Sequence, residues 1–428
     1  MDYKHDIISI PKSILLAGII LYACLGAFAG KPNHVPFPIN TPDSTVISSD
    51  VDSIAFSRRF IHRIGVEMRP SYIFPTHPFL QAENEDLSPI RYSHSSHIKY
   101  SFQFQPGCNA ERIYGGSYQG IGLAHFYFRR QKELGSPIAL YLFQGARITP
   151  LTSWLSLNYE WNFGLSFGWK PYNFETNSYN RVIGSKLNAY INTNFYLNWI
   201  LSPRLNLNTG IALTHFSNGN TNYPNAGLNT IGIQLGLTYN FNKKQDFLSR
   251  PAFIPAFPRH ISYDLVLFGS WRKKGISWGE TQVASPDTYM VMGFNFAPMY
   301  NFGYKFRMGI SLDGVYDGSA NVYTEDYIYG TTQEFFIPSL HKQLALGISG
   351  RCEYVMPYFT VGVGMGVNLL HGGGDLKAFY QILALKTEIT RNTFIHIGYN
   401  LKNFETPNFL MLGIGIRFHN KYPSCYRR

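Results

Sequence analysis

The residues best placed for chemistry in this chain are His215 and Ser217, which stand two positions apart in the segment from Thr214 to Gly219. A serine hydroxyl is a weak nucleophile until a neighbouring base takes its proton, and histidine is the side chain that most often serves as that base. The pair therefore points to acyl transfer by a serine esterase.

Other short motifs lack the context that their chemistry requires. Gly164-Leu-Ser-Phe-Gly168 matches the GxSxG nucleophile motif, which needs a sharp strand-to-helix turn, but here it lies within an unbroken strand-like alternation. His371-Gly-Gly-Gly-Asp375 lacks the Gly-Lys-Ser/Thr of a phosphate-binding loop, so we interpret it as a glycine-rich turn. No His, Cys, Asp or Glu residues show metal-ligand spacing, and we expect neither a metal nor an organic cofactor.

The elements that position His215 and Ser217 are predicted to be strands of an all-β outer-membrane antiparallel barrel. From Leu155 to Trp169 and from Asn188 to Trp199, apolar and polar residues alternate strictly, and asparagines dominate one face of the second segment. An asparagine-lined face is typical of a wet barrel lumen, with the apolar face towards lipid. Aromatic residues make up 16% of the chain and charged residues only 15%, against roughly 25% charged in an average soluble domain.

The number of strands suggests two related halves. About eight strand-like runs lie between His62 and Phe241, and about eight more lie between Ile261 and Phe418. Tyr223-Pro-Asn225 and the strand after it resemble Thr406-Pro-Asn408 and its following strand, which indicates a tandem repeat of about 180 residues. The repeat is compatible with two eight-stranded barrels or with one barrel of about sixteen strands.

The predicted organisation begins with an export signal. Residues 1–29 are typical of a signal peptide ending at Ala27-Phe-Ala29, although Cys24 leaves a lipoprotein cleavage site as an alternative. A flexible leader (30–57), a barrel with the candidate site (58–242), a proline-rich linker (243–259), a second barrel-like repeat (260–418) and a tail (419–428) follow. The predicted location is the outer membrane of a Gram-negative bacterium.

The net charge of +11 suggests an anionic partner, which we expect to be the headgroups of outer-membrane lipid. Basic residues do not form a run, and an exported chain seldom meets nucleic acid, so nucleic acid is not an expected partner. The oligomeric state stays open.

The phase of two strands places three polar side chains outside the barrel. In the strand ending at Ser217, His215 and Ser217 continue the face of Leu213, while Asn229 is in phase with Ile231 in the following strand. The connecting loop, residues 218–228, makes the two strands a hairpin, so these side chains are expected to cluster at one rim. The structural alternative is that they are interfacial polar residues without a catalytic role.

The segment His215-Phe-Ser-Asn218, the glycine after it, and the loop Pro224-Asn-Ala-Gly227 resemble the PagL-type lipid A 3-O-deacylases, an acyloxyacyl hydrolase family, most clearly over residues 185–241. The resemblance implies a Ser-His-acid triad on the outer wall of a small barrel, with Ser217 as nucleophile, His215 as general base, and Asn218 and Gly219 binding the oxyanion. At the position of the acid stands Asn229, an amide that can hold the imidazole tautomer but supplies no charge. That departure implies lower activity, another carboxylate in its place, or an inactive site.

These observations predict a carboxylic ester hydrolase that removes an ester-linked 3-hydroxyacyl chain from the lipid A of lipopolysaccharide, with the choice among acyl chains left open. The alternative is a non-enzymatic outer-membrane barrel, either a small pore or a lipopolysaccharide-binding structural protein. In the second half, the segment matching the motif, residues 398–405, contains neither His nor Ser, so a structural or binding role is expected there.

Overall fold

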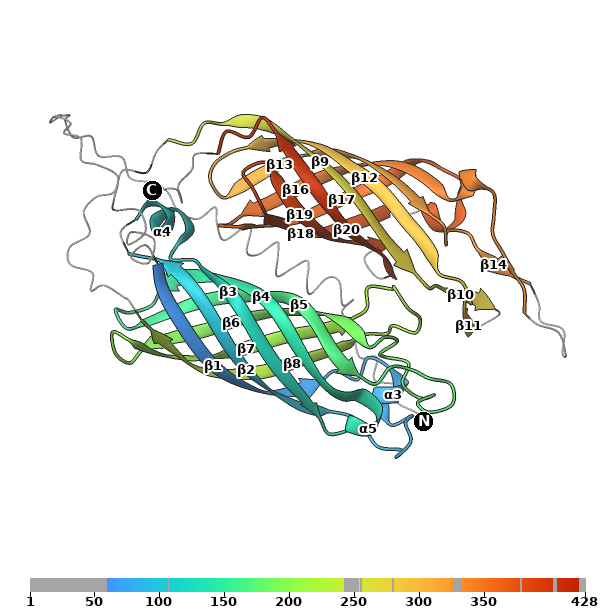
Figure 1. Ribbon diagram of the computed structural model, residues 1–428, viewed down its shortest axis with the longest axis horizontal. Coiled ribbons are helices and arrows are strands. Elements are labelled where there is room, and N and C mark those ends of the chain that lie inside the picture. The colour runs from blue at the N-terminus through green and yellow to red at the C-terminus, as the bar shows by residue number, and fades with distance from the viewer. Residues whose placement is uncertain are drawn as a thin grey trace, which may run out of the picture.

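The computed structural model describes residues 60–106, 108–241, 254, 256–278, 281–325, 333–377, 379–402 and 406–422. The predicted signal peptide and leader, most of the predicted linker and the last six residues of the predicted tail lie outside these residues. Two closed eight-stranded antiparallel barrels lie side by side (Figure 1). This arrangement decides between the two architectures that the repeat had allowed.

The first barrel runs in sequence order from β1 to β8 and closes by pairing β1 with β8. Its strands are β1 (Phe60–Ile73), β2 (Tyr92–Phe104), β3 (Tyr118–Phe128), β4 (Gly135–Pro150), β5 (Leu155–Trp169), β6 (Leu187–Ile200), β7 (Leu205–Ser217) and β8 (Leu228–Asn240). Three short helices in its connections have no counterpart in the sequence prediction: α3 (Pro78–Gln81), α4 (Asn109–Tyr114) and α5 (Gln131–Leu134). Helices of four to six residues carry too little periodicity to be recognised from sequence.

The second barrel closes by pairing its first strand, β9, with its last, β20. Its strands are β9 (His260–Arg272), β12 (Tyr289–Asn301), β13 (Phe306–Asp317), β16 (Leu344–Val355), β17 (Phe359–His371), β18 (Phe379–Glu388), β19 (Thr393–Lys402) and β20 (Thr406–Phe418). Two small hairpins extend from its rim: β10 (Gly275–Trp278) with β11 (Thr281–Ala284), and β14 (Tyr323–Thr324) with β15 (Phe335–Phe336). Two 3-10 turns, η1 (Leu340–Lys342) and η2 (Gly374–Leu376), complete the described elements.

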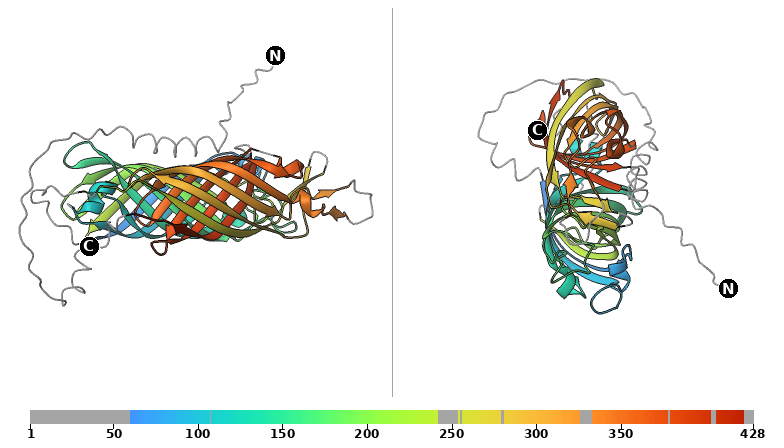
Figure 2. Two further views of the ribbon diagram at one scale, coloured as in Figure 1. Left: turned by 90° about the horizontal axis from the view of Figure 1, so that it is seen from above. Right: turned by 90° about the vertical axis from the view of Figure 1, so that its right-hand side faces the viewer.

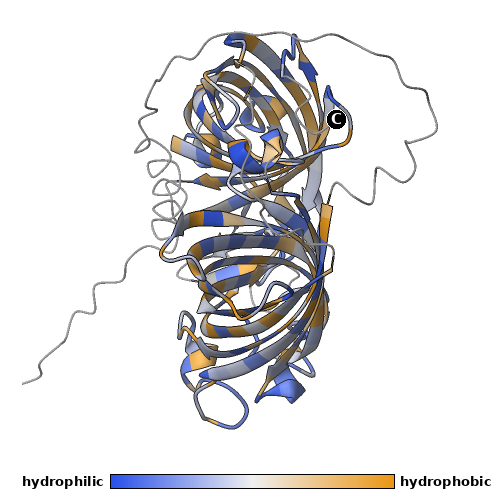
Figure 3. Ribbon diagram, turned by 90° about the vertical axis from the view of Figure 1, so that its left-hand side faces the viewer, coloured by the Kyte–Doolittle hydropathy of each residue, from blue (hydrophilic) through white to orange (hydrophobic). Residues whose placement is uncertain are grey.

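Hydrophilic and hydrophobic residues alternate along the strands (Figure 3), and the burial pattern places the polar ones inside the barrel and the apolar ones outside, as expected from the sequence. In β8, Gln234 is 1% exposed and its neighbour Leu235 is 53% exposed. The asparagines of β6 line the lumen, where Asn192 Nδ2 donates to Thr214 Oγ1 at 2.8 Å. Exposed apolar side chains on the outer wall are suited to lipid, because hydrocarbon cannot satisfy polar groups.

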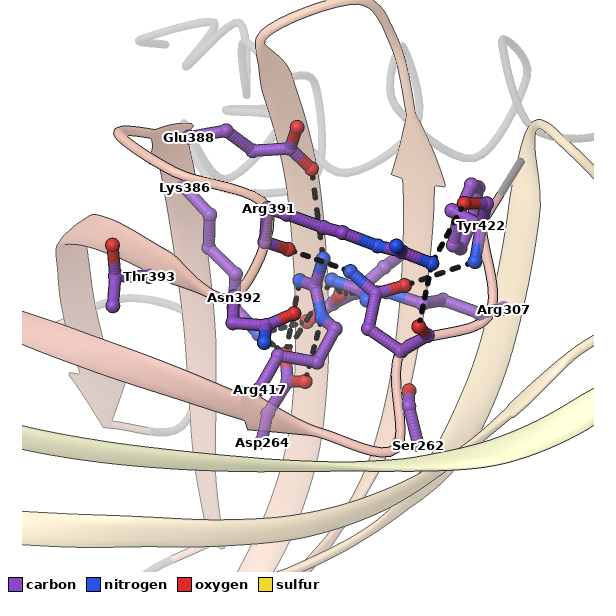
Figure 4. A network of polar contacts seen from close by, with 12 residues as sticks. Ser262, Asp264, Arg307, Lys386, Glu388, Arg391, Asn392, Thr393, Arg417 and Tyr422 are labelled. Atoms are coloured by element: carbon purple, nitrogen blue, oxygen red, sulfur yellow. Dashed lines mark hydrogen bonds and ion pairs between the residues drawn. The ribbon is translucent and has the colours of Figure 1, made fainter. Parts of the chain in front are cut away.

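Both lumens are filled by paired charges and aromatic rings. In the first barrel, Lys99 Nζ lies 3.4 Å from Glu67 and also binds Glu160, whose other oxygen accepts from Tyr118 at 2.8 Å. In the second, Asp264 accepts from Lys386 and Arg417, each at 2.8 Å (Figure 4). Charges buried in this way are stable only when they are paired, so the two networks fix the interior of each barrel.

Seen along their length, the two barrels lie one against the other (Figure 2, right), and their outer walls touch through apolar side chains. Met356, Phe359 and Leu385 of the second barrel form a buried apolar cluster with Trp161 and Phe163 of the first. The rings of Trp161 and Phe359 meet edge to face, with centroids 5.2 Å apart. A second region of contact is described below.

Candidate active site

The outer face of β7 ends in His215 and Ser217, as the strand phase predicts. Thr214 and Phe216 are buried in the lumen, whereas His215 and Ser217 are half-buried on the outside. His215 pairs with Ile191 of β6 on one side and with Asn229 of β8 on the other. The regular ladder therefore fixes the backbone of both candidate residues on the lipid-facing wall, at the rim.

His215 and Asn229 are joined by a hydrogen bond. Directly opposed residues of neighbouring antiparallel strands have their side chains on the same face, and His215 Nδ1 lies 2.7 Å from Asn229 Oδ1. Because an amide oxygen only accepts, this contact places the proton on Nδ1 and leaves Nε2 as a base. The Asn229 amide thus holds one tautomer of the imidazole and brings no charge to it.

Ser217 lies on the same face, two residues beyond His215, opposite Ala189 of β6. Its hydroxyl forms no hydrogen bond with another residue of the described chain. Catalytic hydrogen bonds are often long in a free enzyme and tighten when substrate binds, so proximity on one strand face is the relevant geometry. The structure brings His215 and Asn229 into contact and places Ser217 beside them.

The loop after Ser217 holds the residues predicted to bind an oxyanion. The Asn218 backbone N–H donates to Asn225 Oδ1 at 3.0 Å, and Asn218 Nδ2 donates to the Asn222 carbonyl at 2.7 Å. The backbone N–H of Asn218 and one of its two Nδ2 hydrogens are therefore engaged within the loop. Gly219 adopts a left-handed conformation, with φ of 64°, and its N–H has no acceptor among the described residues. Of the two predicted residues, Gly219 has the backbone N–H that is without an acceptor there.

Gly227 is a site residue that the sequence prediction did not single out. Its φ is 72°, and a Cβ there would lie 3.0 Å from His215 Cε1. A side chain would therefore be strained and would press on the imidazole. The sequence did carry a signal, because Gly227 directly precedes the strand that bears Asn229.

A second Ser–His pair lies inside the first barrel. Ser95 Oγ lies 2.9 Å from His97 Nε2, and His97 Nδ1 lies 3.0 Å from Tyr141 Oη. Both Ser95 and His97 are buried, so this pair belongs to the lumen network and has no access to lipid. Ser166 of the GxSxG match also points inward in mid-strand and donates to the Asn188 carbonyl, which confirms that it is not a nucleophile elbow.

The glycine-rich segment from His371 to Asp375 is a turn, as interpreted from sequence. Gly373 and Gly374 have φ of 83° and 56°, and Asp375 accepts from the Asn321 backbone N–H at 2.9 Å. Within the described residues, no three His, Cys, Asp or Glu side chains are grouped so as to hold a metal ion. No helix among the residues that the structure describes is long and apolar enough to cross a membrane.

Comparisons with known structures give low overall similarity. A mutant porin of Rh. blastica matches at 8% identity with a TM-score of 0.16, covering 84% of this chain and 100% of the porin. The FrpB iron transporter of Neisseria meningitidis matches at 9% identity with a TM-score of 0.22, and the match covers 84% of this chain and 70% of the transporter. Omp33 of Acinetobacter baumannii matches at 9% identity with a TM-score of 0.14, and the match covers 84% of this chain and 98% of Omp33. At these TM-scores the matches carry no argument about function. No curated protein matches the chain.

Two family models match the sequence, one in each barrel. Residues 97–238 match "Lipid A 3-O-deacylase (PagL)", and residues 261–420 match "Acyloxyacyl hydrolase, C-terminal domain". The first match spans β7, β8 and the loop between them, and the two matched segments together make up most of the chain. The first barrel thus matches the PagL family of lipid A 3-O-deacylases, and the second barrel matches the C-terminal domain of an acyloxyacyl hydrolase.

Proposed function

We propose that this protein hydrolyses an ester-linked 3-hydroxyacyl chain of lipid A with Ser217 as nucleophile and His215 as general base. The observation that carries the proposal is the 2.7 Å contact between His215 Nδ1 and Asn229 Oδ1 on the lipid-facing wall, beside Ser217. It orients a basic nitrogen at the place where a lipid in the outer leaflet would present its ester.

The reaction follows from these positions. Ser217 Oγ attacks the ester carbonyl carbon while His215 Nε2 takes the hydroxyl proton. The oxyanion accepts from the Gly219 N–H and from the second Nδ2 hydrogen of Asn218. Collapse of the tetrahedral species breaks the bond to the sugar oxygen, which takes the proton from His215. Water, activated by the same histidine, then cleaves the acyl-enzyme and releases the 3-hydroxy fatty acid.

The filled lumen favours this function over that of a small pore. In the first barrel, Glu67, Lys99 and Glu160 form a buried network across the interior, and Tyr141, Tyr190 and Phe216 are fully buried there. Together these side chains cross the interior of the barrel, which argues against a wide water-filled channel. Lipopolysaccharide is the proposed substrate, and the outer membrane of a Gram-negative bacterium, reached through the predicted signal peptide, is the proposed location.

Mass spectrometry of lipid A tests the proposal. Cells that express the wild type should lose one 3-hydroxyacyl chain, and cells that express Ser217→Ala should keep it. Ser202→Ala is the matched control, since Ser202 lies in a turn at the opposite end of the same barrel and should not affect deacylation. Unchanged lipid A in cells with well-folded wild type would exclude the esterase and favour the non-enzymatic barrel, whose conductance is then measurable in planar bilayers.

A further inference from the structure

The loop that follows Ser217 is attached to the second barrel by hydrogen bonds. The Lys273 backbone N–H donates to the Thr221 carbonyl at 3.1 Å. Two longer contacts flank it, from Asn220 Nδ2 to the Asn408 carbonyl at 3.5 Å and from Tyr223 Oη to the Gln282 carbonyl at 3.4 Å. The residues between Ser217 and β8 therefore contact β20, the hairpin strand β11 and Lys273, the residue that follows β9.

Close packing accompanies these hydrogen bonds. A Cβ at Gly219 would lie 3.6 Å from the Tyr399 ring and 3.7 Å from Leu410, which is ordinary van der Waals distance. A Cβ at Gly275 would lie only 2.7 Å from the Tyr223 ring, so only glycine fits there without displacing tyrosine. The second barrel thus contacts the loop at the glycine that has the free N–H, and again four residues later.

The surface of the second barrel that receives the loop is itself cross-linked. Arg272, the last residue of β9, donates to Asp317 at 3.1 Å and to Asn408 Oδ1 at 2.9 Å, and its side chain is buried. It joins the end of β9, next to Lys273, to the start of β20, and so it links two of the places that contact the loop. The part of the second barrel that contacts the loop is therefore held together by its own hydrogen bonds.

From this arrangement we infer that the second barrel is a positioning element of the active site, which holds residues 218–227 so that the Gly219 N–H faces the ester bound at Ser217. The inference rests on the proposed function. It also gives a physical role to the half of the chain that lacks the His and Ser. An oxyanion donor displaced by about 1 Å loses much of its effect, and the loss of one such donor reduces kcat by about 10²–10³-fold in serine hydrolases.

The full-length variant Gly275→Val tests the inference, because its side chain would displace Tyr223 without altering any group that touches substrate. We expect kcat to fall by about tenfold or more, while KM stays within about twofold, and we expect faster hydrogen exchange at the Lys273 amide and across residues 218–227. The matched control is Gly350→Val on the outer wall of the same barrel, where a Cβ meets nothing within 4 Å. Heat-modifiable migration on gels shows whether the barrels of each variant are folded.

A double variant separates positioning from simple damage. Tyr223→Ala removes the ring that valine displaces, so the effects of Gly275→Val and Tyr223→Ala should be far from additive. Faster exchange of the loop in Gly275→Val with wild-type kcat would overturn the inference, and so would unchanged exchange. A wild type that leaves lipid A intact would instead refute the proposed function, and the exchange data would still report whether the second barrel holds the loop.

Discussion

Replacing Asn229 by aspartate should make this enzyme faster. The two side chains have the same shape, so the carboxylate would take the place of the amide oxygen, 2.7 Å from His215 Nδ1. In the proposed mechanism His215 becomes an imidazolium during acylation, and a carboxylate at position 229 would stabilise that charge whereas an amide does not. The perturbation therefore changes charge at nearly constant geometry.

The magnitude follows from the separation of the charges. Two unit charges about 4 Å apart at an effective dielectric constant near 20 attract by about 4 kcal/mol. The site is at the rim and both residues are half-buried, so solvent screening and the cost of desolvating the carboxylate remove at least half of this. A net effect of about 1.5 kcal/mol corresponds to roughly a tenfold increase in kcat.

The assay is release of 3-hydroxy fatty acid from lipid A in mixed micelles, with kcat and KM measured for wild type, Asn229→Asp and Asn229→Ala. The alanine variant removes the acceptor that holds the tautomer, so its kcat should fall by about tenfold or more while the barrel stays folded. An aspartate variant no faster than the wild type would mean that another carboxylate already serves His215. An alanine variant as fast as the wild type would refute any role for Asn229 in orienting the imidazole.

Three other substitutions extend the test. Gly227→Val should lower kcat more than it raises KM, because its side chain would press on the His215 ring and would be strained at φ of 72°; equal kcat in steady-state assays would contradict this contact. Asp264→Asn removes the one carboxylate that pairs with all three buried cations, Arg307, Lys386 and Arg417, and leaves them with Glu353 and Glu388. It should lower the unfolding free energy of the second barrel, read from urea unfolding, by about 3 kcal/mol. Burial opposes ionisation of Asp375, yet Lys274 beside it holds the pKa of this carboxyl below its ordinary value. A lowered folded-state pKa stabilises the fold above about pH 4, and this contribution is lost as the pH falls through the folded value. In the wild type, hydrogen exchange of the turn around Asp375 should therefore become faster as the pH is lowered, and in Asp375→Asn it should not. The same pH dependence of exchange in both proteins would contradict a stabilising contact between Asp375 and Lys274.

Much of the fold could be predicted because a barrel strand alternates between two environments. In β5 to β8, polar and apolar residues alternate as buried and exposed positions do. The pattern therefore predicted both the positions of the strands and the outward direction of the His215, Ser217 and Asn229 side chains. Closure into two barrels could not be predicted in the same way. It depends on the pairing of β1 with β8 and of β9 with β20, and local alternation contains no information on which distant strands pair.

The same distinction applies to the site. The contact between His215 and Asn229 follows from strand phase and a hairpin, which are local properties. The hydrogen bonds that attach the loop to the second barrel join residues far apart in sequence. Thr221 and Lys273 are more than fifty positions apart, and Asn220 and Asn408 are more than 180 apart. None of these residues has an unusual type or spacing. Only the placement of the second barrel reveals it.

Closure of each half on itself has a consequence for how the two halves meet. A closed barrel has no unpaired strand edge, so neither barrel needs the other to satisfy its backbone. Among the described residues, the barrels meet through apolar side chains around Tyr358 and Phe359 and through several hydrogen bonds. Because one chain carries both barrels, their encounter is intramolecular, and the effective concentration of one surface near the other exceeds that of separate molecules. In the proposed arrangement, modest contacts are then sufficient to keep the loop 218–227 in place.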